Sequence, residues 1–147
     1  GVLRAAPAPR AVSAGDVAEL EAKRRWLREH YDEEARHLYD TLAGKLRLLA
    51  TILDNGWVGA ADTLQLHCLG VGFGDALVQA LGLEWVMVED EYGRDAALRA
   101  EGSSLRLFPL TSIAKRIERG EQVDVRALFE QACAQFRRLA QDADPDR

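Results

Sequence analysis

Apolar residues recur at helical spacing through the N-terminal half of the chain. The first helix that this spacing predicts has an apolar side made of Val17, Leu20, Leu27 and Tyr31. Ser13 or Asp16 precedes that pattern and supplies a suitable N-cap. A second stripe consists of Leu38, Leu42, Leu46, Leu49 and Leu53, and an Asp-Asn-Gly stop follows it. The pattern predicts two amphipathic helical segments and leaves open whether they join or bend near Asp32.

A third helix is predicted between Gly59 and Leu81, where apolar residues occupy most sides. Gly82 follows at the position of a left-handed C-cap. The glycines at positions 70, 72 and 74 lack the spacing and the preceding strand of a phosphate-binding loop. Because glycine lowers helix propensity, three of them in one helix indicate a thin face against which a neighbour packs closely. We expect the sheet to be that neighbour.

The pattern changes to strand-like alternation after residue 83. Residues 85–88 form a short β-rich run, residues 90–93 have turn chemistry, and residues 96–98 offer a return strand. A third strand is expected at residues 105–108, ended by Pro109. These segments predict a small antiparallel meander of three strands.

Two helices are expected after the strands. Thr111 or Ser112 caps a short helix that ends at Gly120, and Asp124 caps the last helix. The inward positions of the last helix are Leu128, Phe129, Ala132, Phe136 and Leu139. The order of elements predicts an α+β fold, in which N-terminal and C-terminal helices pack the three-stranded meander. At 147 residues we expect one domain over residues 16–142, a flexible leader at 1–15 and a flexible tail at 143–147.

The composition of the chain limits the classes of partner that we expect it to bind. The chain has 24 acidic and 19 basic residues, so its net charge of −5 disfavours nucleic acid as a partner. No uncharged apolar run is long enough for a membrane span. Cys68 and Cys133 stand far apart without histidines at zinc-finger spacing, and we interpret both as buried reduced thiols. We therefore expect a cytoplasmic protein without cofactor or metal, whose oligomeric state the sequence leaves open.

Part of the chain resembles a known family. The segments are GVGFGDALVQALGLEWVMVEDEYGRDAALR, LRLFPLTSIAKRIERGE and VDVRALFEQ. In order, they contain a glycine-aspartate pair in a helix, a tryptophan-containing strand, D-E-x-G, F-P-L and K-R-I-E. Over roughly residues 64–129 they resemble the bacterial domain-of-unknown-function family numbered 3806. The resemblance implies a fold and a bacterial source, and it transfers no catalytic residues.

The densest charge lies at the predicted hairpin tip, where Glu89, Asp90 and Glu91 are adjacent. Such carboxylates are hydrated, paired with a base or presented to a basic partner. The candidate bases are Lys115, Arg116 and Arg94. Asp90 is expected to accept N–H bonds within its own turn, which Gly93 completes.

Glu89, Glu91 and Tyr92 are then free to contact a basic partner protein. Trp57, in an Asn-Gly-Trp-Val-Gly loop, is either a core plug, which we favour, or an exposed anchor that joins this partner-binding set.

An alternative chemistry rests on Glu34 and His37, which form one E-x-x-H motif with His30 a turn away. Di-iron sites use two such motifs, and the sequence has one. His67 and Cys68 are adjacent, so on a helix they point about 100° apart and cannot act as base and nucleophile. The first hypothesis is therefore a non-catalytic protein-binding module, such as an immunity-type inhibitor or a regulatory partner. The second is a small metal-binding protein or enzyme that uses His30, Glu34 and His37.

Overall fold

The computed structural model describes residues 3–4 and 8–142. Its first half contains β1 (Leu3–Arg4), β2 (Arg10–Ala11), α1 (Ala14–Arg28), the 3-10 helix η1 (Glu33–Asp40), α2 (Leu42–Asp54) and α3 (Thr63–Leu81). Its second half contains β3 (Glu84–Asp90), β4 (Gly93–Arg99), β5 (Arg106–Leu107), α4 (Leu110–Glu118) and α5 (Val125–Asp142). The fold class is α+β, as predicted.

The sheet contains the predicted meander and two further strands. Its order is β1-β5-β4-β3-β2, and every neighbouring pair is antiparallel. The expected three strands are thus the centre of a five-stranded sheet. The two edge strands were missed because each has only two residues, too few for an alternating pattern. Residues 3–4 and 10–11 belong to the predicted leader but are part of the sheet, whereas the predicted tail at 143–147 lies outside the described residues.

The helical N-terminal half bends where the sequence left the choice open. Ser13 caps α1 in a capping box with Asp16, and the helix ends at Arg28. The 3-10 helix η1 then begins after Asp32 and leads into α2. Two residues of the predicted apolar stripes, Val17 in α1 and Leu38 in η1, are exposed.

The three glycines of α3 pack closely, as predicted, but mainly against other partners than the sheet. A Cβ atom at Gly70 would lie 2.4 Å from the Cα atom of Leu110 in α4. At Gly72 it would meet the side chains of Leu27 and Leu49, from α1 and α2, and at Gly74 the ring of Trp85 in β3. Only the last contact involves the sheet. Gly82 ends the helix with a φ of 67°, as expected of a left-handed cap.

The C-terminal helices follow the prediction except at one cap. The N-cap of α4 is Pro109, so Thr111 and Ser112 lie inside the helix. The Ser112 hydroxyl instead donates a hydrogen bond to the Phe108 carbonyl at 3.3 Å. Asp124 caps α5 by accepting from the Ala127 N–H at 3.0 Å. Four of the five predicted inward residues of α5 are buried, and Leu139 is half-buried.

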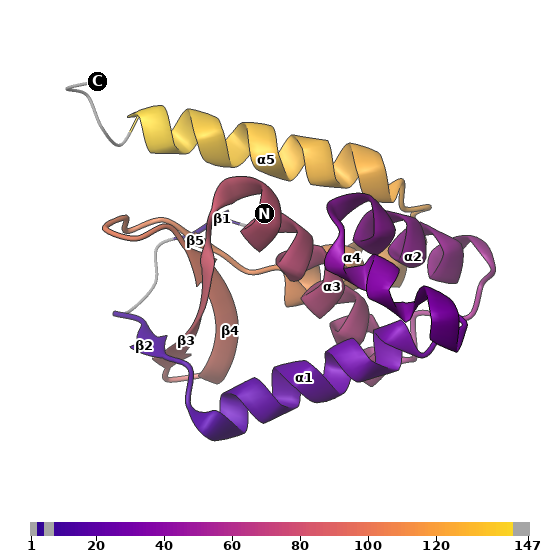
Figure 1. Cartoon of the computed structure of the whole chain (residues 1–147). Helices are drawn as coiled ribbons and strands as arrows, with labels where there is room; N and C mark the ends of the chain where they lie inside the picture. The colour runs from indigo at the N-terminus through magenta and orange to yellow at the C-terminus, as the bar shows by residue number, and fades with distance from the viewer. Residues whose placement is uncertain (1–2, 5–7, 143–147) are drawn as a thin grey trace.

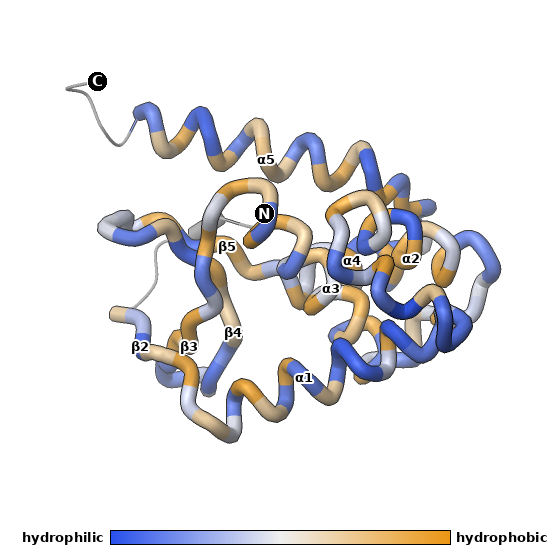
Figure 2. The backbone as a smooth tube through the Cα atoms, in the orientation of Figure 1, coloured by the Kyte–Doolittle hydropathy of each residue, from blue (hydrophilic) through white to orange (hydrophobic). Residues whose placement is uncertain are grey.

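Figure 1 shows the sheet on the left and α2, α3 and α4 on the right, with α1 along the bottom and α5 along the top. In Figure 2, α1 and α5 alternate between hydrophilic and hydrophobic residues, as helices on the outside of a core do.

The two faces of the sheet differ in what they pack against. Trp85, Leu98 and Leu107 face the main core, while a second cluster on the opposite face contains Val86, Val88, Ala97 and Phe108. We call this opposite side the outer face of the sheet.

Candidate functional site

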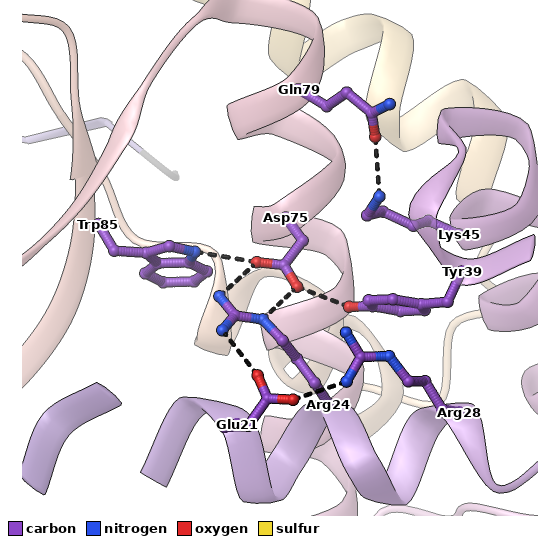
Figure 3. Close-up of polar contacts among 8 residues, drawn as sticks. All are labelled: Glu21, Arg24, Arg28, Tyr39, Lys45, Asp75, Gln79 and Trp85. Atoms are coloured by element: carbon purple, nitrogen blue, oxygen red, sulfur yellow. Dashed lines mark hydrogen bonds and ion pairs between the residues drawn. The ribbon is translucent and has the colours of Figure 1, made fainter. Parts of the chain in front are cut away.

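One buried carboxylate collects four hydrogen bonds in the middle of the molecule (Figure 3). Asp75, 9% exposed on α3, accepts from Arg24 through Nε at 2.7 Å and Nη2 at 2.8 Å. The Tyr39 hydroxyl donates to the same carboxylate at 2.6 Å and the Trp85 indole N–H at 3.0 Å. Asp75 therefore joins α1, η1 and β3 to α3.

The four donors define what Asp75 can do chemically. An ionised carboxylate has about four lone-pair sites, and the bidentate arginine, the phenol and the indole occupy that number. A general base needs a free site to accept a proton from substrate, so this arrangement suits a structural hub. The hydrogen bonds that Arg24 donates to Asp75 raise the pKa of Arg24, which keeps the guanidinium charged. Burial raises the pKa of Tyr39, so the phenol stays a donor.

Further polar side chains lie beside this hub, and together with it they line an open depression of about 460 Å³. Lys45 donates to the Gln79 side chain at 2.8 Å and lies 5.1 Å from the centre of the Tyr39 ring. Arg28 covers the same ring at 5.0 Å and pairs with Glu21 at 2.7 Å. Burial lowers the pKa of the Lys45 ammonium. Cations and carboxylates alternate here, so the depression has no strong excess of either charge.

The hairpin tip between β3 and β4 places the predicted contact residues at the surface. Tyr92 is 91% exposed, and Glu91 is exposed beside it. Asp90 accepts the backbone N–H of Tyr92 at 2.8 Å, and Gly93 has a φ of 126°. Asp90 thus accepts a hydrogen bond within its own turn, and Gly93 adopts a backbone conformation that favours glycine.

The predicted bases of the tip are not its partners. Glu89 pairs with Arg10 at 3.2 Å, across the β2–β3 edge, rather than with Lys115 or Arg116. Arg94 reaches the Asp16 carboxylate at 3.0 Å and so ties the hairpin to the start of α1. Arg10 was overlooked because it belongs to the segment predicted as a leader. Glu91 has no ion pair within the described part of the chain.

Trp57 is 55% exposed, which corrects our preference for a core plug. Its neighbour Val58 enters the core instead. The Trp57 ring lies 5.9 Å from the His30 ring, which contacts Trp26 at 4.4 Å. Trp57 therefore lies near the C-terminal end of α1, whereas the hairpin tip lies near its N-terminal end (Figure 1). The structure does not bring the two parts of the predicted partner-binding set together.

The histidines, Glu34 and the two cysteines are the residues that metal or thiol chemistry would use. Within residues 3–4 and 8–142, no three His, Cys, Asp or Glu side chains form a group that could hold a metal ion. Glu34 and His37 are both exposed on η1, and His30 contacts the Trp26 carbonyl through Nδ1 at 2.9 Å. Cys68 and Cys133 are free and buried, as predicted. Burial raises the pKa of both thiols, which lowers their thiolate fraction at neutral pH.

Comparison with known proteins assigns the family. The family model of the domain of unknown function DUF3806 matches residues 45–129, and the chain belongs to this family. A search among curated proteins finds no match. A crystal structure from Bacteroides thetaiotaomicron VPI-5482 at 1.50 Å resolution has a similar fold, with a TM-score of 0.68 and 14% identity. The similarity covers 88% of this chain and 48% of that one, so this chain spans about half of its length.

The family match contains only part of the hub. The matched residues include Asp75 and Trp85 of the hub, together with Lys45 beside it. Arg24 and Tyr39 precede the matched residues. Sequence reasoning missed this cluster. The available signal was Asp75 itself, the only charged residue between positions 63 and 83, in a helix that is otherwise apolar. A lone carboxylate in a buried helix requires donors, although the sequence does not say which residues supply them.

No helix in the described part of the chain combines the length and the apolar character that a membrane crossing requires.

Proposed function

We propose that this domain is a non-catalytic protein-binding module that presents the β3–β4 hairpin tip to a basic surface of a partner protein. The tip comprises Glu89, Asp90, Glu91 and Tyr92. The observation that carries the proposal is the exposure of Tyr92, 91%, at a turn whose backbone is held by Asp90 and Gly93. Because the turn is already ordered, a partner would bind it at low conformational cost.

The chemistry of the tip favours a basic partner. Tyrosine supplies a large, rigid contact surface and is enriched among residues that dominate binding energy. Glu91 beside it has no ion pair in the described part of the chain, and Arg10 compensates Glu89 only at an exposed position. A basic surface would therefore find an aromatic anchor next to an uncompensated carboxylate.

Trp57 supports a second contact. The two ends of α1 are about 22 Å apart, because the helix has 15 residues with a rise of about 1.5 Å each. A folded partner reaches both the tip and Trp57, whereas a short peptide does not. An immunity-type inhibitor or a regulatory partner, acting in the cytoplasm, fits this requirement. The saturated hydrogen bonding of Asp75 supports the non-catalytic part of the proposal.

The test compares three forms of the tagged protein as bait in lysate from its source cells. The tip variant carries Glu91→Lys and Tyr92→Ser. The matched control carries Glu130→Lys, which makes the same charge change on an exposed position of α5. We expect one basic protein to bind the wild type and the control and to be lost with the tip variant. Captured partners are then purified and their affinities measured at increasing salt concentration.

Support requires that the purified partner bind with an affinity that falls steeply as salt rises, and at least about tenfold more weakly to the tip variant. Trp57→Ala should weaken the same complex if both ends of α1 are in contact. The proposal is wrong if the tip variant retains every partner that the wild type binds, or if the partner is acidic and its affinity is independent of salt.

A further inference from the structure

Lys45 is a buried cation in the open depression beside the Asp75 hub. It is 7% exposed, and its Nζ donates a hydrogen bond at 2.8 Å to the side-chain carbonyl of Gln79, which is neutral (Figure 3). Among the described residues, no carboxylate forms an ion pair with Lys45. A buried ammonium that lacks a carboxylate partner is costly. Because Lys45 lines the depression, a ligand there can supply the missing negative charge.

The other charged residues of the depression determine what kind of ligand fits. Four of the six charged lining residues form two ion pairs, which are Arg24 with Asp75 and Arg28 with Glu21. The fifth is Lys45. The sixth is Asp40, whose side chain is exposed and forms no ion pair within the described part of the chain. Internal pairing therefore leaves one cation and one anion for a ligand.

Gln79 lies between these two residues. Its side-chain carbonyl accepts from Lys45, and its Nε2 donates to the backbone carbonyl of Asp40 at 3.4 Å. Burial lowers the pKa of Lys45, and the charge of Asp40 is near enough to oppose part of that effect. Tyr39, whose ring centre is 5.1 Å from the Lys45 Nζ, and Val78 add apolar surface to the lining. A small molecule with two opposite charges can therefore contact Lys45 and Asp40 together.

We propose that this depression binds the ammonium and carboxylate groups of a free α-amino acid. The carboxylate of the ligand accepts from Lys45, and its ammonium donates to Asp40. At neutral pH an α-amino acid carries one positive and one negative charge, separated by a single carbon atom, which matches the two unpaired charges of the depression. The site shares no residue with the hairpin tip, and the proposal does not depend on the proposed partner protein.

The charge balance of the depression distinguishes the amino acid from other small molecules. A monocarboxylate without an ammonium group would bring its charge close to the Asp40 carboxylate. An amine without a carboxylate would bring its charge close to the Lys45 ammonium. Like charges at such short distances repel each other. The zwitterion is therefore expected to bind more tightly than either singly charged molecule. A volume of about 460 Å³ is within the usual range of small-molecule sites.

The experiment uses L-alanine, because the proposal concerns the two groups that α-amino acids share. NMR of ¹⁵N-labelled protein follows the side-chain amide of Gln79 and the backbone amides of Asp40 and Lys45 at neutral pH and constant ionic strength. We expect saturable shifts with a dissociation constant of about 1 mM or below. Parallel titrations use N-acetyl-L-alanine, which lacks the ammonium, and L-alaninamide, which lacks the carboxylate. Both should bind about tenfold more weakly, because each loses one charge-assisted contact.

Two variants should change the preference among these ligands in opposite ways. Lys45→Met removes the cation and keeps a long side chain, and Asp40→Asn removes the anion at an exposed position. Each should weaken L-alanine binding about tenfold. Lys45→Met should also weaken N-acetyl-L-alanine but not L-alaninamide, and Asp40→Asn should do the reverse. Each variant must first show the signal dispersion of the folded wild type. If Lys45→Met does not fold, Asp40→Asn still decides the test.

The matched controls make the same charge changes outside the depression. Lys115→Met on α4 and Asp54→Asn at the end of α2 alter exposed residues and should leave the affinity for L-alanine unchanged. The proposal is overturned if the Gln79 side-chain amide shows no saturable shift. It is also overturned if N-acetyl-L-alanine or L-alaninamide binds as tightly as L-alanine, or if Asp40→Asn weakens binding no more than Asp54→Asn does.

Discussion

Asp75 and Glu91 are both carboxylates, but they lie in opposite environments. Asp75 is buried, and four donors from three other elements occupy its oxygens. Glu91 is exposed at a hairpin tip and has no ion pair within the described residues. The same functional group therefore stabilises the fold in one place and is available to a partner in the other.

This contrast shows how to separate structure from function in a family without an assigned activity. The polar cluster with the shortest and most numerous contacts looks most like an active site, yet its saturation favours a structural role. The sparsely bonded tip has capacity for new interactions. Variants at the two places should differ accordingly: changes at the hub affect folding, and changes at the tip affect binding.

The largest expected effect comes from Asp75→Ala. It removes the closer of the two carboxylates that pair with the largely buried Arg24 guanidinium, and it removes the acceptor of Tyr39 and Trp85. Breaking one side of a buried pair typically costs about 3–5 kcal/mol. We expect the free energy of unfolding in urea to fall by that amount, or the variant to be unfolded in water.

Glu21→Ala provides the control within the same network. Glu21 also pairs with Arg24 and Arg28, but its side chain is 44% exposed and solvent screens these pairs, so its removal should cost less than about 1 kcal/mol. An Asp75→Ala variant as stable as Glu21→Ala would show that Asp75 is not the hub of the fold.

A smaller effect is expected where α3 packs against its neighbours. Gly70→Ala would place a Cβ atom 2.4 Å from the Leu110 backbone, which moves only together with α4. We expect a loss of about 2 kcal/mol, within the range of overpacked cores. Thermal or urea unfolding measures it.

Gly72→Ala makes the same substitution two residues further along α3. Its Cβ would meet only the ends of the Leu27 and Leu49 side chains at 3.0 Å, which adjust more easily. The gain of up to about 1 kcal/mol in helix propensity offsets this contact. The expected change is near zero. Equal losses at Gly70 and Gly72 would contradict the assignment of Gly70 as the contact between α3 and α4.

Local patterns in the sequence predicted the elements around these glycines well. Periodicity located α1, α2 and α3, and turn chemistry located the β3–β4 hairpin with Asp90 in its turn. These features depend on residues close together in the chain, where spacing is informative. Strands β1 and β2 were not predicted because a segment of two residues cannot show an alternating pattern. That residues 16–142 form a single domain stays a prediction.

Pairings over long sequence distances were not predictable in the same way. Arg24 and Asp75 are 51 positions apart, and any of several arginines satisfies the same chemistry. Glu89 pairs with Arg10 rather than with Lys115 or Arg116, because the β2–β3 register brings Arg10 beside it. Charge identity limits the candidates, but only the assembled topology selects among them. The exposure of Trp57 likewise depends on which residue of its loop, Trp57 or Val58, reaches the core.

The smallest expected effect on stability belongs to the tip. Glu91→Lys with Tyr92→Ser changes two exposed side chains whose removal breaks no contact with the core, so unfolding should change by less than about 0.5 kcal/mol. Asp90→Ala provides the comparison. It removes the acceptor of the Tyr92 N–H, so we expect the free energy of unfolding to fall by about 0.5–1.5 kcal/mol. If the tip variant were as destabilised as Asp90→Ala, Glu91 and Tyr92 would contribute to the fold. Any loss of partner binding would then no longer distinguish a contact surface from a damaged hairpin.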